Sequence, residues 1–213
     1  MVGALDTFIG RLNNDNSDDQ IPGWAVDTIK EWWKSHVAHA TDHCKSEEKT
    51  YKPIFGERFI WPTEIDTLHD ELDSVKDEVQ TIMDKINKEK VSLTAVRDAL
   101  AGYEETMLKH FEVEEMKVLP LMRAHFTAEE LSITNRKVLE DASENAMGAL
   151  IYAMSPDGNK FRSDFMKIRG IPSFVWYLAF KPRLNHYTKD VVAKVEAIES
   201  GEQPSARKKS SWL

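Results

Sequence analysis

Apolar residues recur along most of this chain at alternating steps of three and four, the spacing that places side chains on one face of an α-helix. The clearest stripe follows Thr63 and predicts a helix over about residues 63–88. Similar stripes predict one helix that begins after Pro22 and another that begins at Ser92. No strand-like alternation of any length occurs, so we expect an all-α fold. The first stripe consists of Ile65, Leu68, Leu72, Val75, Val79, Ile82 and Ile86.

A fourth helix is expected to begin after Thr127, whose side chain can cap it together with Glu130, and to continue to Met154. Amphipathic helices with short connections predict an antiparallel four-helix bundle. Before Pro22, the apolar residues of segment 5–12 predict a short additional helix. The fold class expected is therefore an all-α bundle with extra helices at its ends.

The C-terminal part is separated from this bundle by the turn-rich segment 155–159. Two shorter helices are expected beyond it, over about 172–181 and 184–199, divided at Lys181 and Pro182. The predicted organisation is a short N-terminal helix and linker (1–21), a helical bundle (22–155), a helical extension packed on the bundle (156–201) and a disordered tail (202–213).

Composition narrows the functional classes. The chain has 213 residues with 28 Lys plus Arg against 36 Asp plus Glu, a net charge of −8, so we expect neither a nucleic-acid partner nor an anionic membrane surface. No apolar run approaches the length of a membrane span. The single cysteine, Cys44, cannot form an internal disulfide, and the N-terminus has no secretory pattern. A cytoplasmic location is the expectation.

One polar motif, H-x-x-x-E-E-x-x-x-x-P, occurs twice at an offset of 67 residues. Its histidine and first glutamate fall on the inward stripes of their helices, since positions i and i+4 share one face. The matched pairs are His43 with His110, Glu47 with Glu114, Glu48 with Glu115, and Pro53 with Pro120.

Burying two such imidazole and carboxylate pairs in an apolar core costs several kcal/mol unless partners or a metal compensate. A shared cation would remove that cost for all four groups. A single histidine on an apolar stripe is usually a packed core residue, and paired glutamates are usually solvated, so the prediction depends on repetition of the whole motif. His69 adds a fifth group from a third helix, and His39, one turn before His43, is a sixth candidate. The predicted metal ligands are His39, His43, Glu47, His69, His110 and Glu114.

These residues resemble the hemerythrin-like, or HHE cation-binding, family. The resemblance rests on the first motif with Pro53, on His69 opening the run H-D-E-L, and on the second motif with VLP at 118–120, and it covers about residues 24–125. It implies a left-handed four-helix bundle that holds two carboxylate-bridged non-haem irons. The implied bridging carboxylates are Glu47 and Glu114, and the implied terminal imidazoles are His43, His69 and His110.

The chain departs from the family pattern at one point. The family also takes a histidine from the helix before the first motif, whereas segment 5–12 contains none. Two alternatives follow: His39 takes its place, because an H-x-x-x-H pair on one helix can chelate a metal, or one metal position is under-coordinated, weak or empty. The order of histidine then glutamate, four residues apart, differs from the Glu-x-x-His of ferritin-like bundles and favours the hemerythrin interpretation.

Imidazole and carboxylate donors suit iron, zinc, copper or manganese, and the lone Cys44 is expected to be a small packed residue rather than a ligand. The leading hypothesis is a di-iron protein that binds or senses iron or oxygen species, dioxygen or peroxide, rather than an enzyme. A di-iron oxidase or peroxidase acting on a small molecule or ferrous iron is one alternative. The other is a metal-free helical adaptor that binds a protein partner through Phe174, Trp176, Tyr177 and Phe180.

Overall fold

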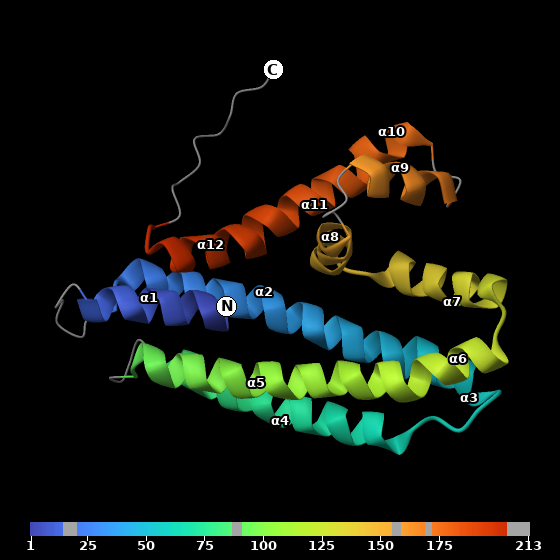
Figure 1. The fold of residues 1–213 in the computed structure, drawn as a ribbon, viewed down its shortest axis with the longest axis horizontal. Coiled ribbons are helices and arrows are strands. Elements are labelled where there is room, and N and C mark those ends of the chain that lie inside the picture. Colours follow the sequence, from blue (N-terminus) through green and yellow to red (C-terminus); the bar gives the residue numbers. More distant parts are fainter. Residues whose placement is uncertain (15–20, 87–90, 155–158, 169–171, 204–213) are drawn as a thin grey trace.

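The structure, a computed structural model, consists of helices joined by short connections (Figure 1). No strand occurs in the part of the chain that it describes, so the predicted all-α class is confirmed. The described residues are 1–14, 21–86, 91–154, 159–168 and 172–203.

The two helices that carry the repeated motif are long and continuous. The first begins after Pro22 and the second after Ser92, whose side chain caps it by accepting a hydrogen bond from the Ala95 amide. The first consists of α2 (Gly23–Ser46), the π-helical turn η1 (Glu47–Tyr51) and α3 (Lys52–Gly56). The second consists of α5 (Leu93–Val113), the π-helical turn η2 (Glu114–Val118) and α6 (Leu119–His125). Between them lies α4 (Thr63–Lys85).

Each of these π turns ends two residues before a proline, Pro53 or Pro120. A proline inside a regular α-helix lacks the amide hydrogen for its bond, and its ring collides with the carbonyl four residues earlier. The wider π turn accommodates the ring without ending the helix. The motif proline thus explains why the local geometry changes at the motif glutamate.

The expectation that Lys181 and Pro182 divide the C-terminal helix is wrong, because a π turn accommodates Pro182 in the same way. Pro182 follows a third π turn, and the helix continues without a break from Ser173 to Ser200. Its parts are α10 (Ser173–Val175), η4 (Trp176–Phe180), α11 (Lys181–Tyr187), η5 (Thr188–Val192) and α12 (Ala193–Ser200).

The predicted fourth helix is wrong in its length. Thr127 and Glu130 form the expected capping box, but the helix they open, α7 (Ala128–Asp141), stops before Ala142, whose backbone is extended. Ser143 then caps a separate helix, α8 (Glu144–Ala153), by accepting a hydrogen bond from the Ala146 amide. The Ala142 and Ser143 pair therefore turns the chain where apolar spacing alone predicted continuity.

The turn lets α8 cross α11 closely at Gly148. A Cβ atom built there would lie 2.5 Å from the Tyr187 Cβ and 2.6 Å from the Arg183 carbonyl oxygen, so only glycine fits this crossing. The helix α9 (Asn159–Ile168) then packs with these segments through Met166, against Trp176 and Ile151.

The centre of the molecule is the packing of α2, α4 and α5, in which α4 runs antiparallel to the other two (Figure 1). The apolar stripe predicted for 63–88 faces inward, with Ile65, Leu72 and Val79 almost fully buried. Burial of each such side chain contributes roughly 1.5–3 kcal/mol. The helix ends at Lys85, and residues 87–88 of the predicted span lie outside the described part.

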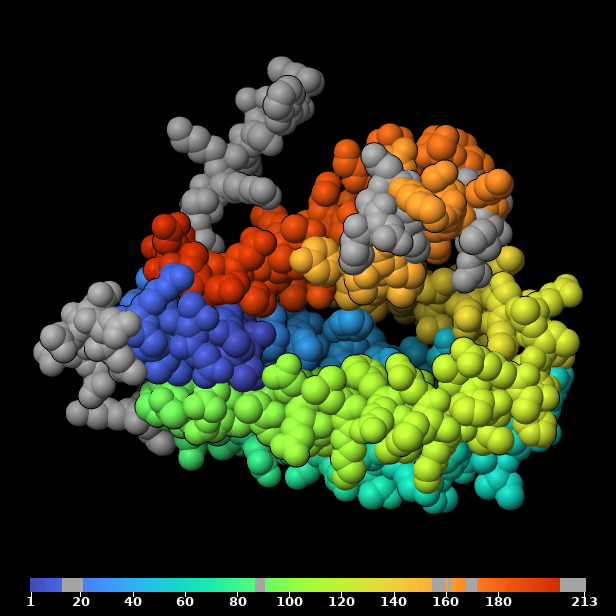
Figure 2. Space-filling view, viewed as in Figure 1, coloured from blue at the N-terminus to red at the C-terminus, as the bar shows by residue number. Residues whose placement is uncertain are grey.

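The remaining face of α2 is covered by different segments along its length. Near the start of α2 it is covered by α12 and by α1 (Val2–Asn14), the short N-terminal helix that segment 5–12 predicts. Near η1 it is covered by α7. Between α5 and the segments α8 and α11 the surface is hollowed, with α2 at the floor (Figure 2). The predicted turn at 155–158 and the tail from 204 lie outside the described residues, and the division into four units stays a prediction.

Candidate metal centre

The repeated motif places its histidine and glutamate at equivalent points of two parallel helices. His43 and His110 lie in the last turns of α2 and α5, and Glu47 and Glu114 are the first residues of the π turns that follow. His69 comes from the middle of α4, the antiparallel helix between them. Three helices therefore direct polar side chains into one volume.

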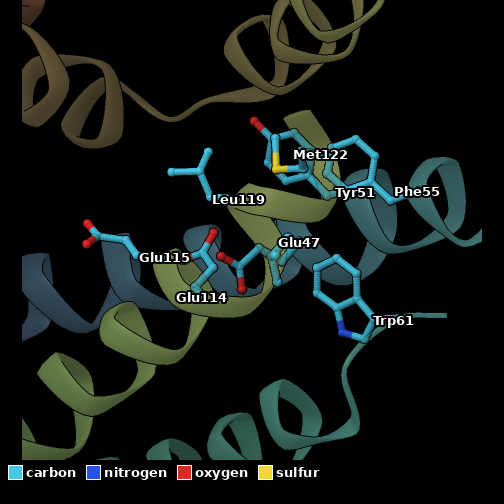
Figure 3. Close-up of a pocket in the computed structure, with 9 residues that line it drawn as sticks. Glu47, Tyr51, Phe55, Trp61, Glu114, Glu115, Leu119 and Met122 are labelled. Atoms are coloured by element: carbon cyan, nitrogen blue, oxygen red, sulfur yellow. The ribbon is translucent and has the colours of Figure 1, made fainter. Parts of the chain in front are cut away.

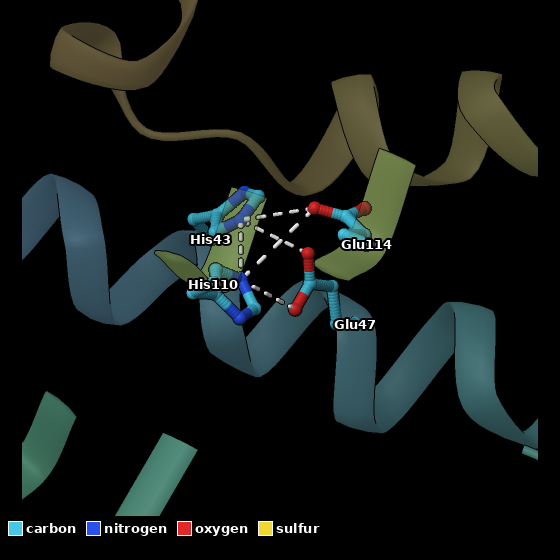
Figure 4. A group of neighbouring side chains, drawn as sticks. All are labelled: His43, Glu47, His110 and Glu114. Carbon is cyan, nitrogen blue, oxygen red and sulfur yellow. Dashed lines mark hydrogen bonds and ion pairs between the residues drawn. The ribbon is translucent and has the colours of Figure 1, made fainter. Parts of the chain in front are cut away.

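Four of these side chains form a compact group (Figure 4). One ligand atom from each of His43, Glu47, His110 and Glu114 lies within 4.8 Å of the others. The Nε2 atoms of the two histidines are 3.4 Å apart, and each lies 4.0 Å from Glu114 Oε2. Nitrogen and oxygen donors at these separations could surround a single cation or one member of a metal pair.

Glu47 stands at the middle of the group, and its two oxygens face different imidazoles. Oε1 lies 2.9 Å from His43 Nε2, whereas Oε2 lies 2.8 Å from His69 Nε2 and 3.5 Å from His110 Nε2. The second nitrogen of His69, Nδ1, lies 3.3 Å from Glu48 Oε1. Three imidazoles therefore gather around one carboxylate, in an arrangement in which each oxygen could bind a separate metal ion.

The two copies of the motif bury different members of the pair. In the first copy the glutamate is enclosed, with 2% of its side chain exposed, and the histidine is 33% exposed. In the second copy the histidine is fully enclosed and Glu114 is 31% exposed. The open members, His43 and Glu114, give the group one accessible side.

Several atoms of the group lack a hydrogen-bond partner among the described residues. They are Glu47 Oε1, His69 Nδ1 and His110 Nδ1. Glu47 Oε1 has His43 close by, but not in the direction of a hydrogen bond. Buried polar atoms in proteins are normally paired, and unpaired ones call for an explanation such as an ion. The donor set and the unpaired Glu47 oxygen fit a bound metal cation.

The protonation of Glu47 is controlled by its histidines. Burial alone would raise the pKa of this carboxyl, but the contacts from His43 and His69 outweigh burial and lower the pKa to about 2. In return, the pKa values of both histidines are raised: burial acts to lower them, and the negative charge of Glu47 overcomes it. The histidines therefore keep Glu47 ionised at neutral pH inside the molecule.

In the second copy of the motif the pKa shifts are reversed: the pKa of the glutamate is raised and that of the histidine is lowered. Burial, and secondarily the nearby charge of Glu47, raise the pKa of Glu114 to about 7. Burial lowers the pKa of His110 to about 4, so this imidazole is neutral at pH 7 and has a lone pair for a metal. The two copies of one motif thus carry different charges.

His39, the sixth predicted ligand, lies one turn before His43 but outside the group of four. It is half-buried, and burial and the proximity of His43 lower its pKa. Among the described residues no ion pair joins His39 to Glu47 or Glu114, and its role as a ligand stays a prediction. The N-terminal helix α1 packs at the far end of the bundle, so it does not approach the group either (Figure 1).

The other histidines lie elsewhere. His36 is stacked on Trp32 at 4.8 Å, and its Nε2 lies 3.2 Å from the Tyr103 hydroxyl. Burial lowers the pKa of His36 to about 4. His125 and His186 are exposed.

Cys44 and the C-terminal aromatic residues also have defined surroundings. Cys44 is half-buried against the core, and burial raises the pKa of its thiol to about 11, in keeping with the packed role expected for it. Phe174 and Tyr177 are more than half exposed, but Trp176 is buried beneath Arg162. Binding of a protein partner by this segment stays a prediction.

A cavity of about 280 Å³ adjoins the two motif carboxylates (Figure 3). Glu47, Glu114 and Glu115 form one side of it, and aromatic and apolar side chains form the rest. Tyr51 continues the helical spacing that begins after Pro22, but spacing of this kind does not indicate a cavity. Trp61 was not found by sequence reasoning at all, because it lies in the connection before α4, where no helical spacing applies. The lining residues are Glu47, Tyr51, Phe55, Trp61, Glu114, Glu115, Val118, Leu119 and Met122.

Comparison with protein-family models, curated proteins and solved structures found no match to this chain. Within the described residues, every helix is too short or too polar to cross a lipid bilayer. The inference of function therefore depends on the geometry of the site.

Proposed function

We propose that this chain is a hemerythrin-like metal protein that holds two carboxylate-bridged iron ions and binds or senses dioxygen, peroxide or iron. One observation carries the proposal: the two oxygens of Glu47 face different imidazoles, from α2 on one side and from α4 and α5 on the other. A carboxylate with nitrogen donors at both oxygens has the arrangement of a bridging ligand.

The charge balance supports the same proposal. Glu47 is an anion, His110 is neutral, and Glu114 becomes an anion when it loses a proton that it holds only weakly at neutral pH. A cation would pair with the carboxylates and compete with protons for the imidazole nitrogens. His43, Glu47, His69, His110 and Glu114 would hold the metal pair.

For the fold, we interpret α2, α4, α5 and α7 as the four helices of such a bundle. Their contact at the site end supports this, since α7 packs beside η1 and the Tyr51 hydroxyl donates a 2.9 Å hydrogen bond to Asn135 Oδ1 on α7. The fourth helix would then be shortened where Ser143 redirects the chain.

Bound iron would supply redox chemistry and Lewis acidity at this position. The protein's own residues control access to it. The accessible side formed by His43 and Glu114 admits small molecules, while His110 and Glu47 lie beyond the reach of bulk water. The carboxylate of Glu48 lies 3.3 Å from His69 Nδ1, close enough to attract this ring electrostatically.

A second candidate function is a di-iron oxidase or peroxidase. The cavity beside Glu47 and Glu114 favours this alternative, because it provides room for a small molecule next to the carboxylates. Turnover of peroxide or ferrous iron by the metal-loaded protein would distinguish it from binding or sensing.

The test of the proposed function is metal stoichiometry. After anaerobic loading with ferrous iron and removal of excess metal, we expect close to two equivalents per chain by elemental analysis, because two carboxylates are available to bridge. Uptake below about a tenth of an equivalent would exclude the metal proposal.

If His39 is the sixth ligand, His39→Ala should lose metal at one position, while His36→Ala, one turn further away, keeps both. Equal losses in the two variants would exclude His39.

A further inference from the structure

The second glutamate of the later motif copy, Glu115, takes no part in the group of four candidate ligands. It is exposed, and none of the ion pairs among the described residues includes it. It lines the cavity together with Glu114 and Glu47, and Glu114 lies between the other two (Figure 3). Exposure falls in the same order, since 31% of the Glu114 side chain and 2% of the Glu47 side chain are exposed. Three carboxylates therefore lead from the surface to the buried centre.

The charged groups of this cavity are all of one sign. Among the described residues that line it there is no lysine, arginine or histidine, and the remaining walls are aromatic or apolar. Two lysines on the same helices are paired with acidic residues of α4 instead, Lys52 with Asp66 and Lys117 with Glu64. A cleft with charges of one sign and walls of low polarity concentrates the electric field and raises the local concentration of ions of the opposite sign. The cavity therefore attracts cations and repels anions.

The cavity is partly open to solvent, and its inner end adjoins the candidate metal ligands. Glu114 belongs both to the cavity wall and to the group of four, whose ligand atoms lie within 4.8 Å of one another. Glu47 Oε1 is buried there without a hydrogen-bond partner among the described residues. A cation that reaches Glu114 therefore lies next to the donors of His43, His110 and Glu47.

The other approach to the centre is past His43, and it lacks such a series of carboxylates. The His43 side chain is 33% exposed, and the ring of Phe111 packs at a right angle to it, with the ring centres 5.4 Å apart. The groups met on this side are an imidazole and a phenyl ring, neither of which carries a negative charge. This approach therefore attracts a cation less than the cavity does.

From these observations we propose that the cavity is the entry route of divalent metal cations to the centre, and that Glu115 captures them before Glu114 passes them inward. The inference rests on the proposed function, because it concerns how the metal ions of that centre are acquired. It gives Glu115 a role in the rate of metal binding, separate from the ligands that determine the amount bound.

The experiment measures the rate at which the metal-free chain takes up Co²⁺, a divalent ion that accepts the same imidazole and carboxylate donors as ferrous iron. Its visible absorption changes when these donors bind, which stopped-flow measurement follows, and elemental analysis gives the final metal content. At low ionic strength, Glu115→Gln should lower the second-order rate constant about three- to tenfold, and Glu115→Lys at least about tenfold. Both variants should reach the metal content of the unchanged chain. In about 1 M salt, which screens charges beyond about 3 Å, the differences should fall to within about twofold.

The matched control is Glu112→Gln, which removes the same charge from an exposed glutamate of α5 outside the cavity and should change the rate less than about twofold. Two larger side chains distinguish the two approaches. Leu119→Trp narrows the cavity and should slow uptake at every salt concentration, whereas Phe111→Trp enlarges the ring beside His43 and should leave the rate unchanged.

Uptake that Phe111→Trp slows and Leu119→Trp does not would overturn the proposal, and so would equal rates for Glu115→Lys and Glu112→Gln at low salt. A rate that does not rise with Co²⁺ concentration would overturn it as well, because opening of the protein rather than capture would then limit uptake. These outcomes concern chains that end with bound metal. A chain that binds neither Co²⁺ nor ferrous iron at equilibrium instead contradicts the proposed function, which elemental analysis reports separately.

Discussion

The two copies of the H-x-x-x-E-E-x-x-x-x-P motif have nearly the same backbone geometry but opposite environments. Each places its histidine in the last turn of an α-helix and its glutamate at the start of a π turn. In the first copy the glutamate is enclosed and anionic, while in the second the histidine is enclosed and neutral. The motif determines where these side chains lie, and their neighbours determine their charge.

Part of the difference between the two glutamates comes from α4. His69 on that helix reaches Glu47 at 2.8 Å, and its imidazole helps to lower the pKa of that carboxyl. Glu114 lies on the accessible side and has no histidine closer than 4.0 Å among the ion pairs of the described residues. A carboxylate inside the three-helix packing is held by imidazoles, whereas its counterpart is left for a cation or a proton.

The largest effect is expected from removing the central carboxylate. Glu47→Ala should eliminate metal binding at both positions, because this residue faces every imidazole of the group. Glu114→Ala should leave up to one equivalent, and both variants should keep their helicity. Elemental analysis and circular dichroism measure the two quantities.

The control for this pair is Glu112→Ala, which removes an exposed glutamate from the same helix as His110 and should keep full metal content. Equal loss in Glu47→Ala and Glu114→Ala would contradict the asymmetry between the two copies.

A smaller effect is expected from removing the metal from the unchanged chain. A cation that binds the folded state alone stabilises it by about 2.7 kcal/mol when its concentration is a hundredfold above the dissociation constant. For a chain of this size, that corresponds to a fall of about 5–10 °C in Tm on chelation. Thermal denaturation with and without chelator measures it, and coinciding curves would count against a buried metal centre. The shift should shrink in Glu114→Ala and vanish in Glu47→Ala.

The smallest effect concerns the pH dependence of the metal-free protein. The pKa of Glu114 is about 7 in the folded state, above its ordinary value of 4.5. Between these two pH values the folded chain therefore holds a proton on Glu114 that the unfolded chain has lost. Stability from this group is present below pH 4.5 and is lost as the pH rises to 7. Glu114→Gln removes that loss, and it should gain about 1–2 kcal/mol over the unchanged chain between pH 4.5 and pH 8, after allowance for partial exposure.

Urea denaturation of both proteins at the two pH values measures this gain. The difference is the informative quantity, because His110 acts in the opposite direction: its pKa is lowered to about 4, so its contribution to stability is lost as the pH falls from 6.5 to 4. A Glu114→Gln variant with the same advantage at both pH values would show that Glu114 is not the group that titrates.

Much of the fold was predictable because spacing and capping are local properties. The helix starts after Pro22, at Ser92 and at Thr127 follow from proline and capping chemistry, and the inward face of α4 follows from its apolar stripe. Apolar residues continue across Ser143, so the spacing does not predict the break there. A π turn leaves no trace in hydrophobic spacing, so Pro182 reads as the end of a helix although the helix continues.

The site divides in the same way. The convergence of His43, Glu47, His110 and Glu114 was predictable, because the motif repeats on two helices of one bundle. Their charges were not, since the pKa of each group depends on packing between helices. Trp61 could not be found from the sequence, because its position beside Glu47 depends on the path of a connection rather than on a periodic element.

The prolines that follow the π turns also restrict which deletions and substitutions this chain can accept during evolution. A π turn contains one residue more than an α turn would, and losing that residue would ordinarily restore the regular helix. With Pro53 or Pro120 still in place, the proline ring would collide with the backbone of the restored α-helix. Loss of the extra residue is therefore tolerated only together with replacement of the proline. The wide turns that begin at Glu47 and Glu114 are thus protected from reversion by a double requirement, met independently in each half of the repeat.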